Sequence, residues 1–131
     1  MIKPSAVGAG HAGPILKMFH DGGFRIVAMK FLKMTPGQAG SFYEVHRGKV
    51  FYNSLVEFMS SGPIIALVLE KENAVEEFRK FIGATDPSKA DPGTVRNLFG
   101  TSLTENAVHG SDSDENAVLE AAFFFSQLER F

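Results

Sequence analysis

The chain of 131 residues contains no cysteine, which excludes disulfide bonds and thiolate chemistry. It also has little net charge, because 13 basic and 15 acidic residues sum to −2, so membranes and nucleic acids are unexpected partners. Its apolar runs, such as PIIALVL at 63–69, fall far short of the roughly 20 residues that cross a bilayer. The opening MIKPSAVGAG lacks the apolar segment of a signal peptide. These absences predict a soluble, cytoplasmic protein.

The chain does have enough apolar material for a hydrophobic core. Hydrophobic residues make up 44% of the sequence and include 13 phenylalanines, and the 21% of charged residues is typical of folded proteins. Because this length suits one compact unit, we expect residues 1–131 to form a single domain.

Periodicity and chain-breaking residues predict the order of the elements. β-rich stretches predict strands over 24–32 and 63–70, with shorter ones over 1–3 and 106–109. Helices are predicted over 14–21, 35–46, 51–59, 72–83, 94–100 and 111–128, and a glycine-rich loop over 5–13. This order is βαββαβ and indicates an α+β fold.

His109 has features that a nucleophile needs. The GSDS segment at 110–113 offers helix N-cap residues, so free main-chain N–H groups near the ring favour an anion. Glu120 lies two helical turns after Ser113 and could hold one imidazole nitrogen as N–H, leaving the other free to attack. The alternative is structural, with His109 at a strand end and the polar residues capping a helix. On spacing alone, the structural role is the stronger of the two.

Other polar and aromatic residues carry weaker signals. Lys3, Arg79 and Arg96 are scattered cations that singly are expected at the surface, although together with a histidine they would suit a polyphosphate. The remaining histidines show no metal-binding spacing and are expected to be ordinary loop or surface residues: His11, His20 and His46. GAGHAG at 8–13 matches neither the Walker nor the dinucleotide fingerprint. Phe51 and Tyr52 are by default core residues, but an exposed aromatic there could stack on a base.

The segment NAVHGSDSDENAVLEAAFFF, at 106–125, resembles the active-site signature of nucleoside diphosphate kinases, in which N-x-x-H-G-S-D-S precedes a helical glutamate. Further stretches resemble the family in the same order: MIKPSAV, GFRIVAMKFLKMT, SFYEVH, FYNSLVEFMSSGPIIALVLEKENAV and RKFIGATDPSKADPGTVR. The resemblance covers nearly the whole chain and is of the bacterial type.

This resemblance implies a ferredoxin-like βαββαβ fold with a four-stranded antiparallel sheet and helices packed on it. It implies ping-pong transfer of a γ-phosphate from a nucleoside triphosphate to a nucleoside diphosphate, with little selectivity for base or sugar. Magnesium would bridge the phosphates, held mainly by nucleotide oxygens and not by a protein cage. The family assembles as homo-oligomers, either hexamers or tetramers, and we favour a hexamer.

Motif matching also implies a role for each site residue. His109 would be phosphorylated, Glu120 would orient it, and Ser111 would support both. The nucleotide contacts would come from Lys3 and Tyr43 at the γ-phosphate, Arg79, Thr85 and Arg96 at the β- and γ-phosphates, Asn106 at the ribose, and Phe51 with Leu55 at the base.

Three departures from the family pattern bear on this reading. Ser5 replaces an aspartate, with little expected effect on catalysis. Lys49-Val50 replaces Arg-Pro before Phe51, which should weaken nucleotide binding without abolishing chemistry. The family normally has several residues before M-I-K-P, so the first strand is expected to be truncated. Either the natural chain begins earlier, or this form gives up sheet hydrogen bonds beside Lys3.

Two rival functions remain open at this stage. One is a catalytically weak nucleotide-binding or regulatory protein on the same fold, and the other is a phosphohistidine carrier that passes its phosphate to a protein. A nucleic-acid-binding module is disfavoured by the slightly acidic charge.

Overall fold

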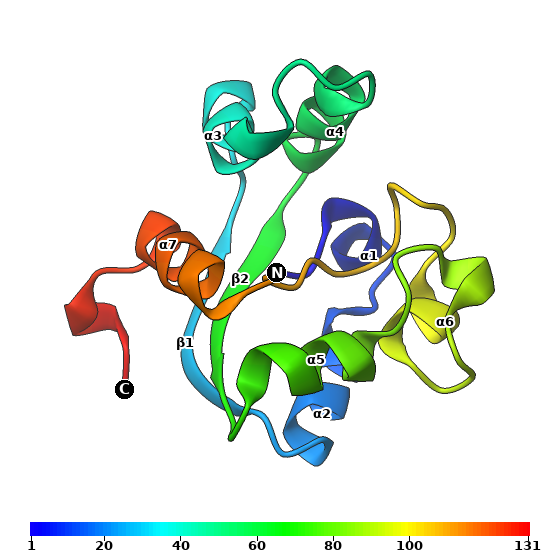
Figure 1. Ribbon diagram of the computed structural model, residues 1–131, viewed down its shortest axis with the longest axis vertical. Coiled ribbons are helices and arrows are strands. Elements are labelled where there is room, and N and C mark those ends of the chain that lie inside the picture. Colours follow the sequence, from blue (N-terminus) through cyan, green and yellow to red (C-terminus); the bar gives the residue numbers. More distant parts are fainter.

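The computed structural model describes residues 1–131 and has an α+β fold around a two-stranded antiparallel sheet (Figure 1). β1 (Arg25–Leu32) pairs with β2 (Ile64–Glu70), with Met29 opposite Leu67 and a register shift between Ile26 and Ala28. Both strands are rich in β-branched and other apolar residues, which suit a pleated surface, although Met29 and Phe31 of β1 remain exposed. The two longer predicted strands are therefore confirmed.

Two further segments reach the sheet through single bridges. Ile2 pairs with Ile65 on one side and with Val108 on the other. It exchanges two main-chain hydrogen bonds with Ile65, of 2.8 and 3.2 Å. Of the strands predicted over 1–3 and 106–109, only Ile2 and Val108 form bridges, and Ala107, with a φ of +74°, interrupts the extended backbone just before Val108. The predicted βαββαβ order is thus present as two strands and two bridges.

Seven α-helices surround the sheet: α1 (Pro4–Gly8), α2 (Ala12–Asp21), α3 (Pro36–Phe42), α4 (Tyr52–Met59), α5 (Ala74–Ile82), α6 (Val95–Phe99) and α7 (Asp114–Phe124). Short 3₁₀ turns follow α3 (Glu44–His46), precede α6 (Pro87–Lys89) and follow α7 (Gln127–Glu129). All six predicted helices are confirmed to within a few residues. The loop predicted over 5–13 is wrong in its first half, because Pro4 presets the first turn of α1.

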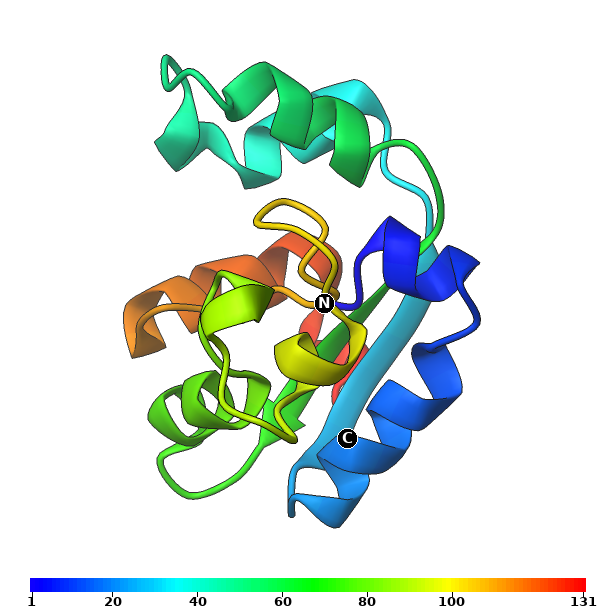
Figure 2. The same cartoon turned by 90° about the vertical axis from the view of Figure 1, so that its right-hand side faces the viewer.

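The main core lies between the sheet and helices α2, α5 and α6. Its largest members are fully or almost fully buried: Ile2, Ile15, Phe19, Phe24, Ile82, Val95 and Val108. A second, smaller core holds α3 and α4 together through Met34, Ala39, Tyr43, Met59 and Ile64. The α3–α4 hairpin therefore packs largely on itself and projects from one end of the molecule (Figures 1 and 2).

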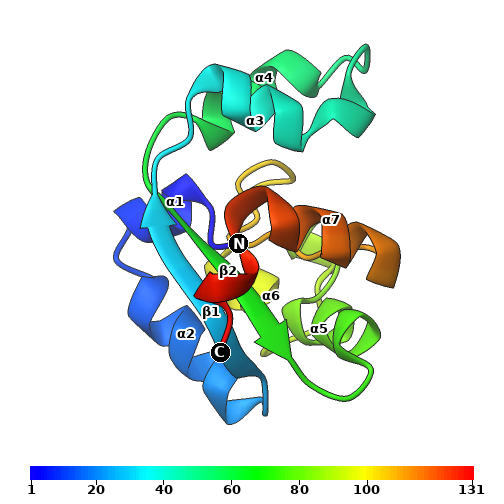
Figure 3. The ribbon, with the colours of Figure 1, turned by 90° about the vertical axis from the view of Figure 1, so that its left-hand side faces the viewer.

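The C-terminal segment covers the sheet on the side opposite α2. Phe125 packs on Ala28 and Ala66, and beyond it the chain runs across the two strands (Figure 3). Phe131 donates a main-chain hydrogen bond of 2.8 Å to Val27, and Lys30 pairs with Glu129 at 2.9 Å. This packing fixes α7, which carries Glu120. None of the helices has the length and apolar character required to traverse a membrane.

Candidate active site

His109 and Glu120 form a hydrogen-bonded pair between the end of the Val108 bridge and α7. Ser113 begins α7 by accepting a hydrogen bond of 3.1 Å from the main-chain N–H of Asn116, which sets the rotation of the helix. Glu120 Oε1 then contacts His109 Nε2. Because a carboxylate only accepts, Nε2 carries the hydrogen and Nδ1 keeps its lone pair. The pair predicted from the sequence is therefore present, with a free Nδ1.

Burial holds the imidazole in its neutral form. Desolvation lowers the pKa of His109, and the hydrogen bond that the ring donates to Glu120 opposes this only in part. The Nδ1 lone pair is therefore available at neutral pH, which is the form that a nucleophile requires.

Two buried cations lie beside this pair without any acidic partner. Lys3 is 6% exposed and donates one hydrogen bond of 3.2 Å from Nζ to the carbonyl of Thr104. Arg96 is 7% exposed and donates only to main-chain carbonyls. Burial, reinforced by Arg96, lowers the pKa of Lys3 to about 8, and burial with nearby Arg79 lowers that of Arg96 to about 10. Uncompensated buried charge is costly, so these residues favour an anionic ligand.

Three of the five buried side-chain polar atoms without a hydrogen-bond partner belong to predicted site residues. The Tyr43 hydroxyl, Arg96 Nε and Asn106 Oδ1 are buried without a hydrogen-bond partner, although Asn106 Nδ2 donates to the carbonyl of Thr85 at 3.0 Å. Burial, together with the negative charge of Glu120, raises the pKa of Tyr43 and keeps its hydroxyl protonated. Native proteins satisfy nearly all buried polar groups, so a cluster of such atoms indicates a polar ligand.

A polar cleft of about 750 Å³ lies next to this cluster. Its lining includes Arg79, Thr85 and Arg96, together with Lys80 and Lys89. Arg79 is exposed and contacts the carbonyl of Gly110 at 3.4 Å. The surface position predicted for single cations is thus right for Arg79 and wrong for Lys3 and Arg96, which the fold buries.

Aromatic rings lead from the α3–α4 hairpin to His109. Phe51 is 47% exposed at the start of α4, and its ring centroid lies 5.2 Å from that of His46. His46 stacks on Tyr43 at 6.2 Å, and the Tyr43 ring lies 5.9 Å from that of His109. The sequence predicts His46 to be a loop or surface residue without a role in the site. Its position three residues after Tyr43, one helical turn away, is the signal that could have found it.

The sequence model described as "Nucleoside diphosphate kinase" matches residues 1–130. The chain belongs to the nucleoside diphosphate kinase family. Curated nucleoside diphosphate kinases are also similar along its length. That of Flavobacterium psychrophilum is 56% identical over 131 residues, covering 100% of this chain and 94% of the relative. That of Chlorobium limicola is 55% identical over 129 residues, covering 98% and 92%.

Solved structures of nucleoside diphosphate kinases share the fold. The Aquifex aeolicus enzyme superposes with a TM-score of 0.97 at 47% identity, covering 99% of this chain and 94% of that one. The Halobacterium salinarum enzyme, solved in complex with CDP, superposes with a TM-score of 0.94 at 36% identity, covering 99% and 87%. The resemblance to a bacterial-type family is therefore confirmed.

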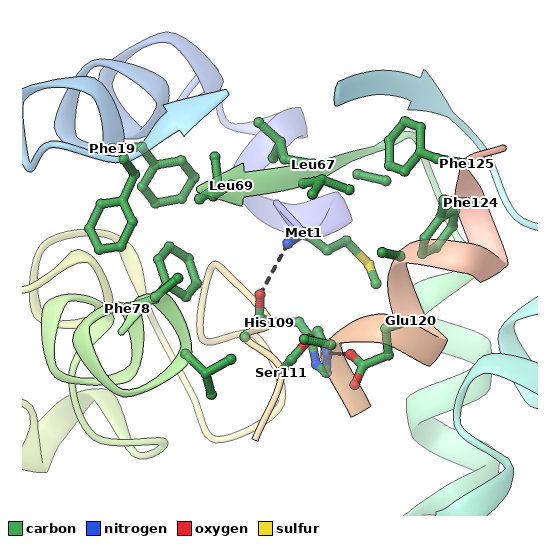
Figure 4. A pocket seen from close by; sticks show the side chains of 18 of the residues that line it. Met1, Phe19, Leu67, Leu69, Phe78, His109, Ser111, Glu120, Phe124 and Phe125 are labelled. Atoms are coloured by element: carbon green, nitrogen blue, oxygen red, sulfur yellow. Dashed lines mark hydrogen bonds and ion pairs between the residues drawn. The ribbon is translucent and has the colours of Figure 1, made fainter. Parts of the chain in front are cut away.

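An apolar cavity of about 130 Å³ lies behind the His109–Glu120 pair in this family member (Figure 4). Leu67, Leu69 and Phe78 line one end, and His109 and Glu120 border the other. The Met1 amino group donates a hydrogen bond of 3.0 Å to the carbonyl of His109 at its edge. Its apolar lining does not suit phosphate, which leaves the cationic side of His109 for the nucleotide.

The remaining predicted residues take different places in the structure. Ser111 lines the apolar cavity beside Glu120, and its supporting role stays a prediction. Leu55 packs in the hairpin core behind Phe51. The structure thus gathers Lys3, Tyr43, Arg96 and Asn106 around His109, whereas Phe51 and Leu55 belong to the separate hairpin.

Proposed function

We propose that this chain is a nucleoside diphosphate kinase that transfers a γ-phosphate through a phosphohistidine at His109. The observation that carries the proposal is a neutral imidazole, hydrogen-bonded to Glu120, beside two buried cations, Lys3 and Arg96, that lack acidic partners. Phosphoryl transfer depends mainly on positioning and charge neutralisation, and this arrangement supplies both.

In the first half-reaction, the Nδ1 lone pair of His109 attacks the γ-phosphorus of a nucleoside triphosphate. The bond from that phosphorus to the oxygen bridging the β-phosphate breaks, and the nucleoside diphosphate leaves with the bonding electrons. Positive charge develops on the ring, and Glu120 stabilises it through Nε2–H. In the second half-reaction, a terminal oxygen of another nucleoside diphosphate attacks this phosphorus and the N–P bond breaks.

The other site residues are proposed to hold the nucleotide in line with Nδ1. Lys3 and Tyr43 would contact the γ-phosphate, and Asn106 would contact the ribose and steady Lys3. The cleft residues Arg79, Thr85 and Arg96 would bind the β- and γ-phosphates. Phe51, backed by Leu55, would stack on the base. Stacking accepts every base because each has a π face, which accounts for broad nucleotide use.

Magnesium is proposed as the cofactor. The structure contains no group of three or more His, Cys, Asp or Glu residues able to hold a metal ion. Separate carboxylates, Glu76, Asp91, Asp112 and Asp114, line the cleft with the cations but form no such group, which fits an ion coordinated mainly by phosphate oxygens. When bound, magnesium would neutralise charge on the transferring phosphates.

Assembly, sheet completion and location belong to the same proposal. We infer a homo-oligomer, hexamer or tetramer, in the cytoplasm. We also infer a four-stranded sheet in the order β1, β2, Ile2, Val108, which the bridges of Ile2 to Ile65 and to Val108 support. Light scattering on the purified protein would measure the assembly directly.

Steady-state kinetics distinguish this function from the two rivals. With ATP as donor and GDP or CDP as acceptor, a ping-pong enzyme gives parallel double-reciprocal lines. A regulatory protein would bind nucleotide without turnover. A phosphohistidine carrier would accept phosphate from ATP but keep it in the presence of free diphosphates.

A further inference from the structure

Arg96 is oriented by two main-chain carbonyls. Its Nη1 donates to the carbonyl of Gly83 at 3.1 Å, and its Nη2 donates to that of Val108 at 3.0 Å. A guanidinium is planar, so two hydrogen bonds to fixed acceptors define its direction. Because carbonyls carry no net charge, they orient Arg96 without neutralising it. The charge therefore stays available to a phosphate.

The first carbonyl belongs to a residue that must be glycine. Gly83 ends α5 with φ +91° and ψ −179°, a region that essentially only glycine enters. A Cβ on Gly83 would lie 2.5 Å from Thr94 Oγ1 and 2.8 Å from Thr94 Cβ. Thr94 cannot easily change rotamer, because its hydroxyl accepts from the N–H of Asn97 at the start of α6 and donates to the main-chain carbonyl of Asp91 at 2.8 Å. α6 is also the helix that carries Arg96.

The second carbonyl follows another strained point of the backbone. The N–H of Val108 donates to the carbonyl of Asn106 at 2.9 Å across Ala107, whose φ is +74°. This is a γ-turn of the positive-φ hand, which is rare and strained. The carbonyl of Ala107 accepts a hydrogen bond of 2.9 Å from Lys3 N–H. One turn therefore fixes the acceptor for Arg96 and the backbone of Lys3.

We propose that Gly83 is a positioning residue for phosphoryl transfer and that it acts through Arg96. The assignment rests on the proposed function. Two unusual backbone conformations, far apart in the sequence, converge on one guanidinium that faces the phosphate site. Strain of this kind persists where the surrounding structure holds it, most often at functional sites. Replacing Gly83 by alanine would shift its carbonyl and misalign Arg96 without removing any charged group.

A double-mutant cycle tests this role. The rate of His109 phosphorylation by ATP is measured for wild type, Gly83→Ala, Arg96→Ala and the double variant. A misplacement of about 1 Å can cost roughly 100-fold, so we expect a loss of about that size for Gly83→Ala in the wild-type background. In the Arg96→Ala background we expect less than about a twofold further loss, because the two residues act as one unit.

Gly93→Ala is the matched control. Gly93 also has a positive φ, of +85°, but a Cβ there meets nothing within 4 Å and its carbonyl does not contact Arg96. It should change the phosphorylation rate less than about twofold while reporting the cost of alanine at positive φ. Circular dichroism melts of all variants separate this cost from the kinetic effect.

The cycle has clear contrary outcomes. An equal loss from Gly83→Ala in both backgrounds would mean that Gly83 acts through packing alone and would overturn the role. A wild-type chain that takes up no phosphate would instead overturn the proposed function, and with it the positioning role of Gly83. If Gly83→Ala does not fold, free guanidinium is added to Arg96→Ala. Partial rescue by guanidinium but not by methylammonium supports orientation of the guanidinium by the carbonyls of Gly83 and Val108, and equal rescue by both overturns it.

Discussion

At the scale of single residues, the site contains two cations without a charged partner and one carboxylate that is hydrogen-bonded to the imidazole. Lys3 and Arg96 contact carbonyls and so keep their positive charge for a ligand. Glu120 is hydrogen-bonded to His109, and its proposed role is to fix the ring and stabilise the positive charge that develops there. This division predicts different consequences for mutating the two kinds of group.

Glu120→Gln should lower the rate of His109 phosphorylation by about 100-fold. Glutamine can still accept the hydrogen bond from Nε2, but it cannot stabilise the positive ring as a carboxylate does. Rapid quench with labelled ATP measures this step, and the affinity for ADP should change little. A rate within a factor of two of wild type would show that the charge of Glu120 is dispensable.

The pH dependence of kcat/KM should report Lys3. Its pKa of about 8 means that the free protein carries the lysine charge below pH 8 and loses it above, so kcat/KM should fall as pH rises through 8. The lowered pKa of His109 should keep the acid side of the profile flat to below pH 6.5.

Lys3→Arg separates these limbs, because arginine holds its charge to a higher pH. The alkaline limb of this variant should move upward while the acid limb stays in place. If wild type and Lys3→Arg share one alkaline limb, Lys3 is not the titrating group.

At the scale of elements, the α3–α4 hairpin has its own small core and carries Phe51, the proposed base contact. Phe51→Ala should raise KM for GDP, ADP and CDP by about tenfold each, because stacking contributes about 1–3 kcal/mol per base and is similar for all. Val50, which is fully exposed beside it, supplies the control: Val50→Ala should leave KM unchanged. Unequal effects among the three bases would contradict a stacking role.

Much of the element order followed from sequence periodicity, and the failures have local causes. Strands 24–32 and 63–70 and the helices were predictable because their apolar residues repeat and their ends carry glycine, serine or threonine. α1 was not, because glycines at 8, 10 and 13 suggested a loop while Pro4 started a helix. The γ-turn at Ala107 has no local signal, since alanine does not mark positive φ.

The candidate site was predictable only in part for a similar reason. The spacing of Ser113 and Glu120 allowed a pair with His109 without favouring it, and Lys3 and Arg96 look like surface charges in the sequence. Their burial depends on contacts across the fold, such as Lys3 with Thr104 and Arg96 with Gly83, and the family resemblance was needed to assign them.

At the scale of the whole molecule, the apolar cavity lies between β2 and the His109–Glu120 pair. Ile65 directs its main-chain groups to Ile2, and Leu67 and Leu69, two and four residues on, face the same way along the cavity. Met1 lies at the edge of the cavity, where its amino group donates to the carbonyl of His109 at 3.0 Å and its carbonyl accepts from the N–H of His109 at 2.9 Å. An extended segment joined to Met1 would continue this pairing.

A Thr-Val-Ala-Val extension ahead of Met1 should therefore raise the free energy of unfolding. Two buried valines contribute about 3–6 kcal/mol and each new sheet hydrogen bond about 0.5–1.5 kcal/mol, against an ordering cost of about 1–2 kcal/mol per residue, so we expect a small net gain. Urea denaturation measures it, and a Gly-Ser-Gly-Ser extension is the control. Equal stability of the two extended chains would contradict strand insertion.

The central claim is that His109 carries the phosphate between nucleotides, and a label-and-chase experiment tests it most directly. The intact chain and His109→Ala are incubated with γ-labelled ATP and magnesium, separated from nucleotide, and chased with GDP. We expect acid-labile label on the intact chain, none on His109→Ala, and transfer of the label to GDP. Absence of label on the intact chain despite nucleotide binding, or equal labelling of His109→Ala, would contradict the account.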